Sequence, residues 1–333
     1  MARHGRRRPA RTVRRTLAVM ITLALACTGC AGTVNKEGDL SRVRIMAPAS
    51  PGGGWDTTSR VLQRTLQREG LVRNVQVFNV EGAGGTIGLG QLAREDDAAL
   101  LMTMGLVMLG AVQTNESEVT LDEVEPIALL TGEPLVIVVP ADSPLQTVED
   151  LAAALRDDPG GTAIAGGSAG GADHILAGLV AKAVGGDPEQ INYIPYSGGG
   201  ESLAALLGSQ VAAGISGVGE YAPQVESGDL RALAVSGEER SDQLPDVSTL
   251  REQGVDVEVT NWRGVMAAPD ISEQERADLI DLVQRAHDTE EWALALETNG
   301  WEDEFMTGDE FRAFLDSEDE RVNGILREIG LIA

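Results

Sequence analysis

Residues 45–90 read IMAPASPGGGWDTTSRVLQRTLQREGLVRNVQVFNVEGAGGTIGLG, and this stretch decides the fold class. It contains two glycine-rich turns, each placed between an apolar run typical of a strand and a segment with apolar residues at helical spacing. The first turn, residues 51–56, follows the apolar run 43–47. A turn of this kind exposes backbone N–H groups at the positive end of a helix dipole, where anions bind well. The stretch therefore predicts a binding place for a small anion.

The same alternation of strand-like and helix-like segments continues along the chain and predicts an α/β fold with mostly parallel sheets. The expected strands are residues 43–47, 75–80, 100–104, 135–139, 162–165, 211–216, 230–236 and 257–260. The expected helices are residues 57–69, 86–94, 147–155, 172–184, 200–207, 272–288 and 309–329, the last of them either continuous or broken.

Two segments resemble crossings between lobes. Residues 136–144 leave a strand through two prolines, and residues 257–264 run from a strand into an Asn-Trp-Arg-Gly sequence. If both are crossings, lobe 1 comprises residues 41–140 plus 257–333, and lobe 2 is the insertion 141–256. This is the layout of a two-lobed binding protein whose ligand lies in the cleft, because ligands of open α/β sheets bind beyond the carboxyl ends of the strands.

The first forty residues predict export. Seven arginines lie within residues 3–15, and an apolar run of ten residues, 17–26, follows them. That run is too short for a bilayer, which takes about 20 residues, and it suits the core of a signal peptide. A plain secretory signal and twin-arginine export through Arg14-Arg15 remain alternatives.

Cys27 and Cys30 end the apolar run, and the residues before each of them fit a lipoprotein box. We therefore predict that residues 1–30 are a lipoprotein signal peptide and residues 31–40 a tether, with the protein anchored by lipid to the outer face of the cell membrane. These are the only two cysteines in the chain, so the folded part is expected to rely on its core rather than on a disulfide.

The net charge of −26 includes the arginines of the signal, so the remainder of the chain is more acidic still. Such acidity argues against nucleic acid or an anionic membrane surface as a partner. It also opposes long-range attraction of an anion. An anion site must therefore act locally, through oriented backbone amides.

Two further glycine-rich turns, residues 165–174 and 196–201, each precede an expected helix. The amides around residues 168–172 are expected to face the cleft from lobe 2, as the first turn does from lobe 1. Asp56 is expected to cap the helix that begins at Thr57 or to face the ligand. Trp55 is expected in the core or in the cleft wall, and Arg263 either beside a ligand carboxylate or in a surface salt bridge.

The sequence supports two other functions less well than anion binding, namely dinucleotide binding and serine hydrolysis. Residues 88–93 match a dinucleotide fingerprint, but they lie inside an expected helix, and no acidic residue closes the next strand. Gly166, Ser168 and Gly170 match the nucleophile elbow of a serine hydrolase. However, a hydrolase needs a histidine that can act as the base for the serine. His174 lies only six residues after Ser168, too near to turn back toward it. His287 lies on a charged helical run rather than in a loop after a strand. No metal-ligand spacing is present, so we expect no metal. We also expect no cofactor, and no catalysis, because the pattern of turns favours a receptor over a hydrolase.

At these turns the chain resembles the substrate-binding proteins of tripartite tricarboxylate transporters, also called Bug receptors. The resemblance spans about residues 43–270. It rests on the sequences of residues 47–56, 82–85, 167–170, 196–200, 245–250 and 261–264, together with Pro269.

The resemblance implies a periplasmic-binding-protein fold of the second type that closes around a small di- or tricarboxylate. It also implies a monomeric receptor that delivers this ligand to large and small membrane subunits driven by an ion gradient. Presentation of the ligand to a sensor kinase is the alternative. The ligand contacts that the resemblance implies are Ser50, Gly53, Gly54, Trp55, Asp56, Gly84, Gly85, Ser168, Ala169, Gly170, Gly171, Ala172, Tyr196, Ser197 and Gly198.

Overall fold

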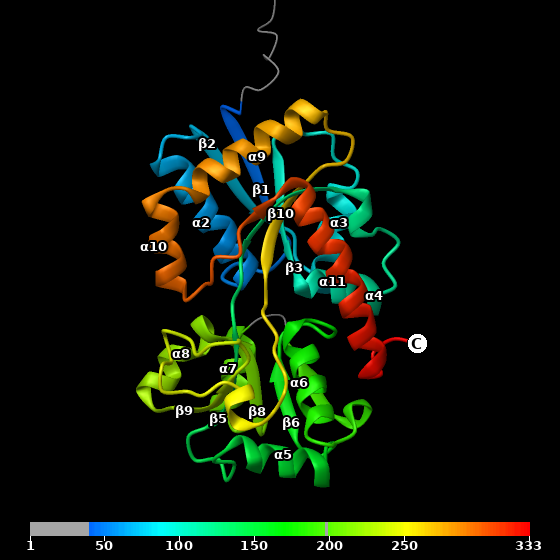
Figure 1. Cartoon of the computed structure of the whole chain (residues 1–333), viewed down its shortest axis with the longest axis vertical. Coiled ribbons are helices and arrows are strands. Elements are labelled where there is room, and N and C mark those ends of the chain that lie inside the picture. Colours follow the sequence, from blue (N-terminus) through cyan, green and yellow to red (C-terminus); the bar gives the residue numbers. More distant parts are fainter. Residues whose placement is uncertain (1–39, 197–198) are drawn as a thin grey trace, which may run out of the picture. The chain divides into compact units, whose positions relative to one another are not determined.

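The computed structural model describes residues 40–196 and 199–333, and residues 40–333 form one compact unit (Figure 1). The predicted lipidation sites Cys27 and Cys30, and the predicted contacts Ser197 and Gly198, lie outside the described residues. Within the described ranges, no helix combines the length and the apolar character that a membrane crossing needs.

The strands of the described residues form two separate sheets, each of which we take with its helices as one lobe. The sheet of lobe 1 has the order β11-β4-β10-β3-β1-β2. Its strands are β1 (Arg42–Ala47), β2 (Asn74–Asn79), β3 (Leu100–Gly105), β4 (Glu125–Thr131), β10 (Arg263–Ala267) and β11 (Met306–Thr307). The sheet of lobe 2 has the order β7-β6-β8-β5-β9. Its strands are β5 (Leu135–Pro140), β6 (Ala163–Gly166), β7 (Asn192–Pro195), β8 (Ala213–Gly217) and β9 (Leu230–Val235).

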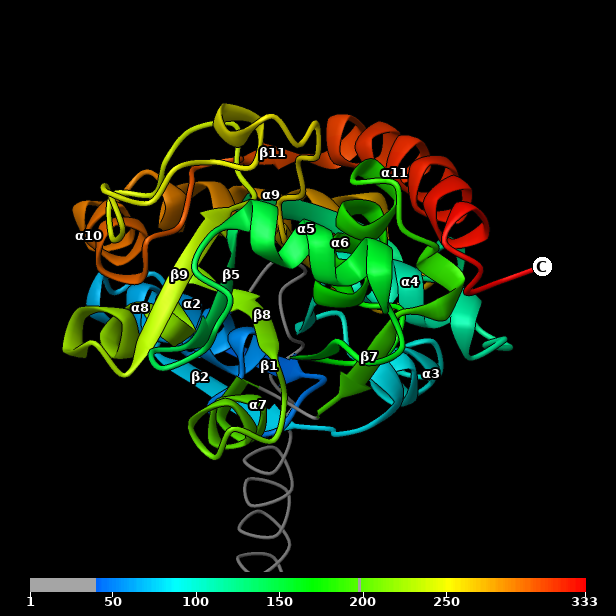
Figure 2. The same cartoon turned by 90° about the horizontal axis from the view of Figure 1, so that it is seen from below.

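Helices pack against both sheets (Figures 1 and 2). Those of lobe 1 are α2 (Gly54–Arg68), α3 (Thr86–Leu92), α4 (Leu106–Thr114), α9 (Glu273–His287), α10 (Glu290–Asn299) and α11 (Gly308–Glu328). Those of lobe 2 are α5 (Val148–Asp157), α6 (Ala172–Ala183), α7 (Gly199–Leu207) and α8 (Val218–Ser227). Short 3-10 helices lie at η1 (Ala83–Gly85), η2 (Leu121–Glu123), η3 (Pro188–Gln190) and η4 (Arg251–Gln253).

Both sheets are mixed, so the prediction of mostly parallel sheets is wrong. β1 pairs in parallel with β2 and β3, and β6 with β7 and β8, whereas β5 and β10 pair antiparallel with both of their neighbours. The reason is the path of the chain. β5 and β10 enter their sheets from the other lobe, at the edge where the parallel strands end, so they must run in the opposite direction.

The first crossing between the sheets lies earlier than expected. β5 begins at Leu135, opposite Gly217 at the end of β8, so the whole strand belongs to lobe 2 and the chain crosses between residues 131 and 135. The expected boundary after Pro140 is therefore too late. The expected strand 257–260 is an extended connection with one isolated bridge, Pro134 to Thr260, and β10 begins only at Arg263 (Figure 1).

Several elements were not predicted, namely β4, β7, β10, β11, α4, α8 and α10. α4 has the sequence LVMLGAVQT, and its side chains are buried on almost every face because it contacts β3, α3, α6 and α11. A helix that is apolar all round lacks the periodicity by which sequence reveals a helix. The last helix, α11, is unbroken over its 21 residues.

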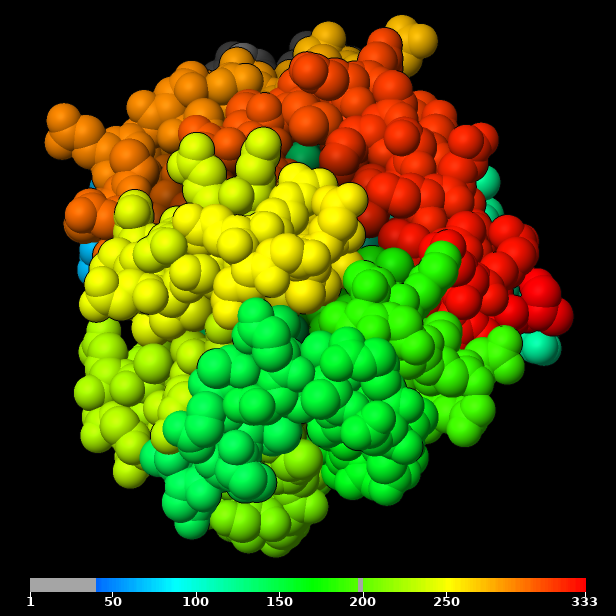
Figure 3. Space-filling view, turned by 60° about the horizontal axis from the view of Figure 1, so that its bottom comes forward, coloured from blue at the N-terminus to red at the C-terminus, as the bar shows by residue number. Residues whose placement is uncertain are grey.

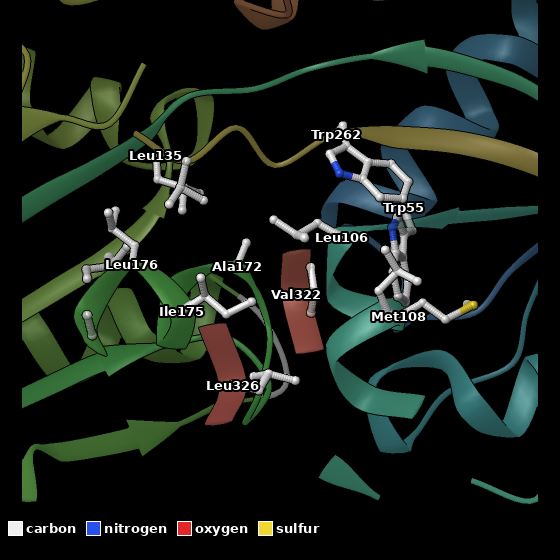
Figure 4. Packing of buried hydrophobic residues seen from close by; sticks show 14 of the residues in the cluster. Trp55, Leu106, Met108, Leu135, Ala172, Ile175, Leu176, Trp262, Val322 and Leu326 are labelled. Carbon is white, nitrogen blue, oxygen red and sulfur yellow. The ribbon is translucent and has the colours of Figure 1, made fainter. Parts of the chain in front are cut away.

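One hydrophobic cluster extends through both lobes. Figure 4 shows Trp55, Leu106 and Met108 from lobe 1 facing Ile175 and Leu176 of lobe 2 across Val322 and Leu326 of α11. α11 belongs to lobe 1 but packs on both α4 and α6, and its C-terminal end lies against the surface of lobe 2 (Figure 3). The two lobes therefore share part of their core beside the cleft.

Candidate functional site

The first glycine-rich turn leads into α2 earlier than expected. The helix begins at Gly54 with Gly53 as its N-cap, so Asp56 is inside the first turn rather than at the cap. The first intrahelical bond runs from the Thr57 amide to the Gly53 carbonyl, 2.9 Å. The amides of residues 54–56 precede it and have no partner within the helix, and the Gly53 cap makes no side-chain hydrogen bond.

Asp56 holds this turn in shape. Its buried carboxylate accepts hydrogen bonds of 2.9 Å each from the Gly52 amide, Arg60 Nε and Asn79 Nδ2. Burial opposes the charge of Asp56, but the hydrogen bonds from Arg60, Gly52 and Asn79 outweigh it and lower the pKa of this carboxyl. The carboxylate is therefore ionised, and its three hydrogen bonds fix the first turn to Arg60 and to Asn79 of β2.

The third turn repeats this arrangement in lobe 2. β6 ends at Gly166, and α6 begins at Ala172 with Gly171 as an N-cap without a side-chain hydrogen bond. The first intrahelical bond runs from the Ile175 amide to the Gly171 carbonyl, 2.9 Å. The amides at the start of α6 are thus free of helical partners, as those at the start of α2 are.

The second turn lies between these two helices. Gly84 and Gly85 have φ values of 60° and 92°, which favour glycine. A Cβ on Gly85 would lie 2.7 Å from the ring of Trp55 and from the methyl group of Met108. The second turn therefore packs directly on Trp55. This tryptophan is buried and also lines the cleft, so it belongs both to the core and to the cleft wall.

These three turns line one cavity of about 250 Å³, which we call the amide cavity. The predicted contacts that line it are Ser50, Gly53, Gly54, Trp55, Gly84, Gly85, Ser168, Gly171 and Ala172. Four predicted contacts lie outside its lining, namely Asp56, Ala169, Gly170 and Tyr196. Gly170 instead lies against Thr114 of α4.

Charged side chains at the cleft complete the site. Of Arg263, Glu133, Asp173 and Glu220, only Arg263 was singled out from the sequence. Arg263 is not at the surface: it is buried, forms an ion pair with buried Glu133, and places its guanidinium 5.6 Å from the ring centroid of Trp301. Glu133 lies in the first crossing and Arg263 at the start of β10, so this ion pair joins the two segments that connect the lobes.

Asp173 and Glu220 line the amide cavity, as does Glu81 beside the second turn. Asp173 accepts a 2.6 Å hydrogen bond from the Gly167 amide. Burial raises the pKa of Asp173 to about 7, and the charges of Glu220 and Glu133 add to the rise. Burial and the charge of Glu133 also raise the pKa of Glu220. Near neutral pH Asp173 therefore carries a proton part of the time and can donate it to a bound anion.

The same geometry gives no support to a serine hydrolase. In the described residues, no hydrogen bond joins Ser168 to a histidine. His174 Nδ1 accepts from the Gly170 amide at 3.2 Å, and its ring stacks on Tyr193 with centroids 4.0 Å apart. Burial lowers the pKa of His174 to about 4. His287 bonds Asp303 within lobe 1 instead.

Glu133 and Glu220 were missed from the sequence, and the signal that could have revealed them is their position at strand ends. Glu220 follows the carboxyl end of β8, and Glu133 follows that of β4, where α/β sheets place their functional groups. Neither could be recognised from sequence, because β4 was not expected and β8 was expected without a turn of its own. Asp173 was visible beside the third turn, but nothing in the sequence distinguished it from other carboxylates.

The fold and the cleft define a two-lobed solute-binding protein. The model of the tripartite tricarboxylate transporter family receptor matches residues 58–331, and the chain therefore belongs to this family. Its relatives include BugT of Bordetella pertussis, 32% identical over 94% of this chain and 97% of that protein. A protein encoded in the TAR-I ttuE-ttuC′ intergenic region of Agrobacterium vitis is 30% identical over 74% of this chain and 71% of its own.

Solved structures share the fold. MatC of Rhodopseudomonas palustris with bound malate superposes with a TM-score of 0.75 at 24% identity, over 86% of this chain and 99% of its own. Rpa4515 of R. palustris with adipate has a TM-score of 0.76 at 21% identity, over 87% of this chain and 97% of its own. The resemblance seen in the sequence and the type of fold it implied are thus confirmed.

Proposed function

We propose that this protein is an extracytoplasmic receptor that binds a small organic carboxylate in the amide cavity and delivers it to a membrane transporter. The observation that carries the proposal is the convergence of two uncapped helix starts, α2 from lobe 1 and α6 from lobe 2, on one cavity. Each presents free amides at the positive end of a helix dipole, so a carboxylate between them draws the lobes together. Malate and adipate in the structures of MatC and Rpa4515 support this ligand class.

Backbone amides are sufficient for useful affinity. A hydrogen bond to a charged group contributes about 1.5–3 kcal/mol. Four to six such bonds, less ordering costs of several kcal/mol, reach the roughly −8 kcal/mol of micromolar binding. A favourable field from the whole protein is not required, which suits a chain with a net charge of −26.

We extend this proposal to the location of the protein and to its membrane partners. We infer a monomer held at the outer face of the cell membrane by a lipid on Cys27 or Cys30. The partners are the large and small membrane subunits of a tripartite transporter driven by an ion gradient. Family membership supports this assignment. Closure of the lobes on the ligand creates the surface that such subunits recognise, because the ligand favours the closed state.

Calorimetric titration with mono-, di- and tricarboxylates at pH 6 and pH 8 tests the proposal. We expect micromolar binding of at least one carboxylate and no binding of its methyl ester. Because the folded pKa of Asp173 is about 7, the protonated form that can donate to the ligand predominates at pH 6 and is lost by pH 8. Affinity should therefore fall by up to about tenfold over this range.

The control for the pH effect is Asp173→Asn, which keeps a donor at this position at every pH and should lose most of the difference in affinity between pH 6 and pH 8. Any remaining difference is assigned to Glu220, whose pKa burial also raises. His174 contributes nothing to the effect, since burial keeps its pKa near 4. A folded protein that binds none of the organic acids would overturn the proposed function.

A further inference from the structure

A second, larger cavity of about 640 Å³ adjoins the amide cavity, and we call it the wide cavity. The two cavities meet at the first turn and at two charged side chains. The residues that line both of them are Ser50, Gly53, Gly54, Glu220 and Arg263. A ligand that extends into the wide cavity from a carboxylate in the amide cavity therefore passes Arg263 and Glu220.

Arg263 has hydrogen-bond donors available for a ligand. Its side chain is buried, and its Nη2 donates to Glu133. Within residues 40–196 and 199–333, its Nε and Nη1 donate to no group, and neither atom is enclosed, so both are open to the cavities that Arg263 lines. A Cβ on Gly54 would lie 2.7 Å from Nη2 and 3.2 Å from Nε, so the guanidinium lies directly against the start of α2. A ligand group next to a carboxylate bound at α2 therefore comes within reach of these donors.

Glu220 supplies a matching acceptor. Its Oε2 accepts from Ser216 Oγ at 2.8 Å, whereas its Oε1 has no partner in the described part of the chain and is also open to the cavities. Burial and the charge of Glu133 raise the pKa of Glu220, and the charge of Arg263 lowers it, so the guanidinium lies near this carboxyl. Among the residues that the structure describes, however, no ion pair joins Glu220 to Arg263. A small group of the ligand can therefore lie between a donor and an acceptor.

A hydroxyl group fits this position better than a second carboxylate or an apolar group. It accepts a hydrogen bond from Arg263 while it donates one to Glu220, whereas a carboxylate can only accept. A carboxylate would also compete with Glu133 for the guanidinium, since the two residues already form a buried ion pair. A methylene group would leave the donors of Arg263 and the Oε1 of Glu220 unpaired in a closed cleft, which is unfavourable.

The rest of the wide cavity offers further polar contacts. Besides the shared residues, it is lined by the uncharged polar side chains of Thr57, Gln243, Thr298 and Asn299 and by the ring of Trp301. A pocket with an aromatic wall and several polar groups suits a ligand that has both C–H faces and hydroxyl groups. The space beyond the amide cavity therefore accepts a chain that carries several hydroxyl groups.

We propose that Arg263 and Glu220 recognise a hydroxyl group close to the carboxylate of the ligand, and that the ligand is a polyhydroxylated monocarboxylate of the sugar-acid class. Arg263 donates to the hydroxyl oxygen, and the hydroxyl group donates to Glu220 Oε1. The remaining hydroxyl groups extend into the wide cavity. This inference rests on the proposed function, since it assumes that the carboxylate occupies the amide cavity.

Matched six-carbon acids test the inference. Gluconate, galactonate and mannonate carry a hydroxyl group on every carbon beyond the carboxylate, hexanoate carries none, and adipate has a second carboxylate instead. In calorimetric titration at pH 7, at least one sugar acid should bind about tenfold or more tightly than both hexanoate and adipate, because it gains hydrogen bonds to two charged groups. Equal or tighter binding of hexanoate or adipate would overturn the inference and leave the proposed function intact. Failure of every carboxylate to bind would instead overturn the proposed function.

Matched variants assign the preference to the two side chains. Arg263→Lys keeps a cation beside Glu133 but loses the guanidinium donors, so the ratio of sugar-acid to hexanoate affinity should fall about fivefold or more. Its control is Arg68→Lys, an exposed ion-paired arginine of α2 outside both cavities, which should leave the ratio unchanged. Glu220→Ala should also lower the ratio, and its control is Glu226→Ala on the exposed part of α8.

The ratio separates recognition from a merely structural role, which would weaken the binding of both ligands alike. An unchanged ratio in Arg263→Lys or in Glu220→Ala would overturn the inference. If Arg263→Lys does not fold, Glu220→Ala decides the test.

Discussion

Replacement of Glu133 by alanine lowers the free energy of unfolding by about 3–5 kcal/mol, because it leaves the buried guanidinium of Arg263 without its counter-charge. Glu133 Oε1 also accepts from the Gly219 amide at 3.3 Å, so the change removes a second buried contact. Urea denaturation of the wild type and the variant measures the loss. Since Glu133 lies where the chain passes from β4 to β5, the expected destabilisation affects both lobes.

The double variant Glu133→Gln, Arg263→Met separates the ion pair from general packing. It removes both charges together, so it should recover most of the stability that either single change loses. The exposed pair Arg68–Glu291 is the control, and Arg68→Ala should cost about 1 kcal/mol or less. If the coupling energy between Glu133 and Arg263 is near zero, the ion pair does not hold the crossings together.

Gly110→Val should abolish carboxylate binding while the protein stays folded. Gly110 lies on α4, and a Cβ at this position would overlap the carbonyl oxygen of Gly170 in the third turn. Both groups belong to backbone that cannot move aside locally, so the valine should hold the lobes apart on this side of the cleft. Calorimetric titration should show at least a hundredfold loss of affinity, and X-ray scattering with ligand should show a larger radius of gyration than the wild type.

The control for Gly110→Val is Gly324→Ala on α11, where an added Cβ meets no atom within 4 Å. It should bind ligand normally and gain up to about 1 kcal/mol of stability, as is usual for a glycine replaced inside a helix. Normal closure and binding in Gly110→Val would show that contact between α4 and the third turn is not needed for function.

Sequence was informative where local chemistry determines structure. Glycine-rich turns between an apolar run and a helical run predicted three of the segments that line the amide cavity, because a helix start needs little beyond its own turn. Ser50, Gly85 and Ala172, which the sequence predicted to lie near one another, line the same cavity. The positions of the two crossings could not be predicted as well from sequence. The starts of β5 and β10 depend on their pairing with strands that are distant in the sequence.

The charged residues of the site could not be recognised from sequence either, because long-range contacts bring them together. Glu133 and Arg263 are 130 positions apart, and only the two crossings bring them together. In a chain with 52 acidic residues, no local pattern separates the buried carboxylates from the solvated ones. Asp56 shows the converse error: its position suggested a helix cap, whereas three hydrogen bonds place it inside the first turn as a brace.

A crystal structure of the protein with its tightest carboxylate tests most directly whether opposed helix starts hold the ligand. We expect one carboxylate group with oxygen atoms about 3 Å from backbone nitrogens at the start of α2 and at the start of α6. A carboxylate held by amides of only one lobe, or bound outside the amide cavity, would contradict it.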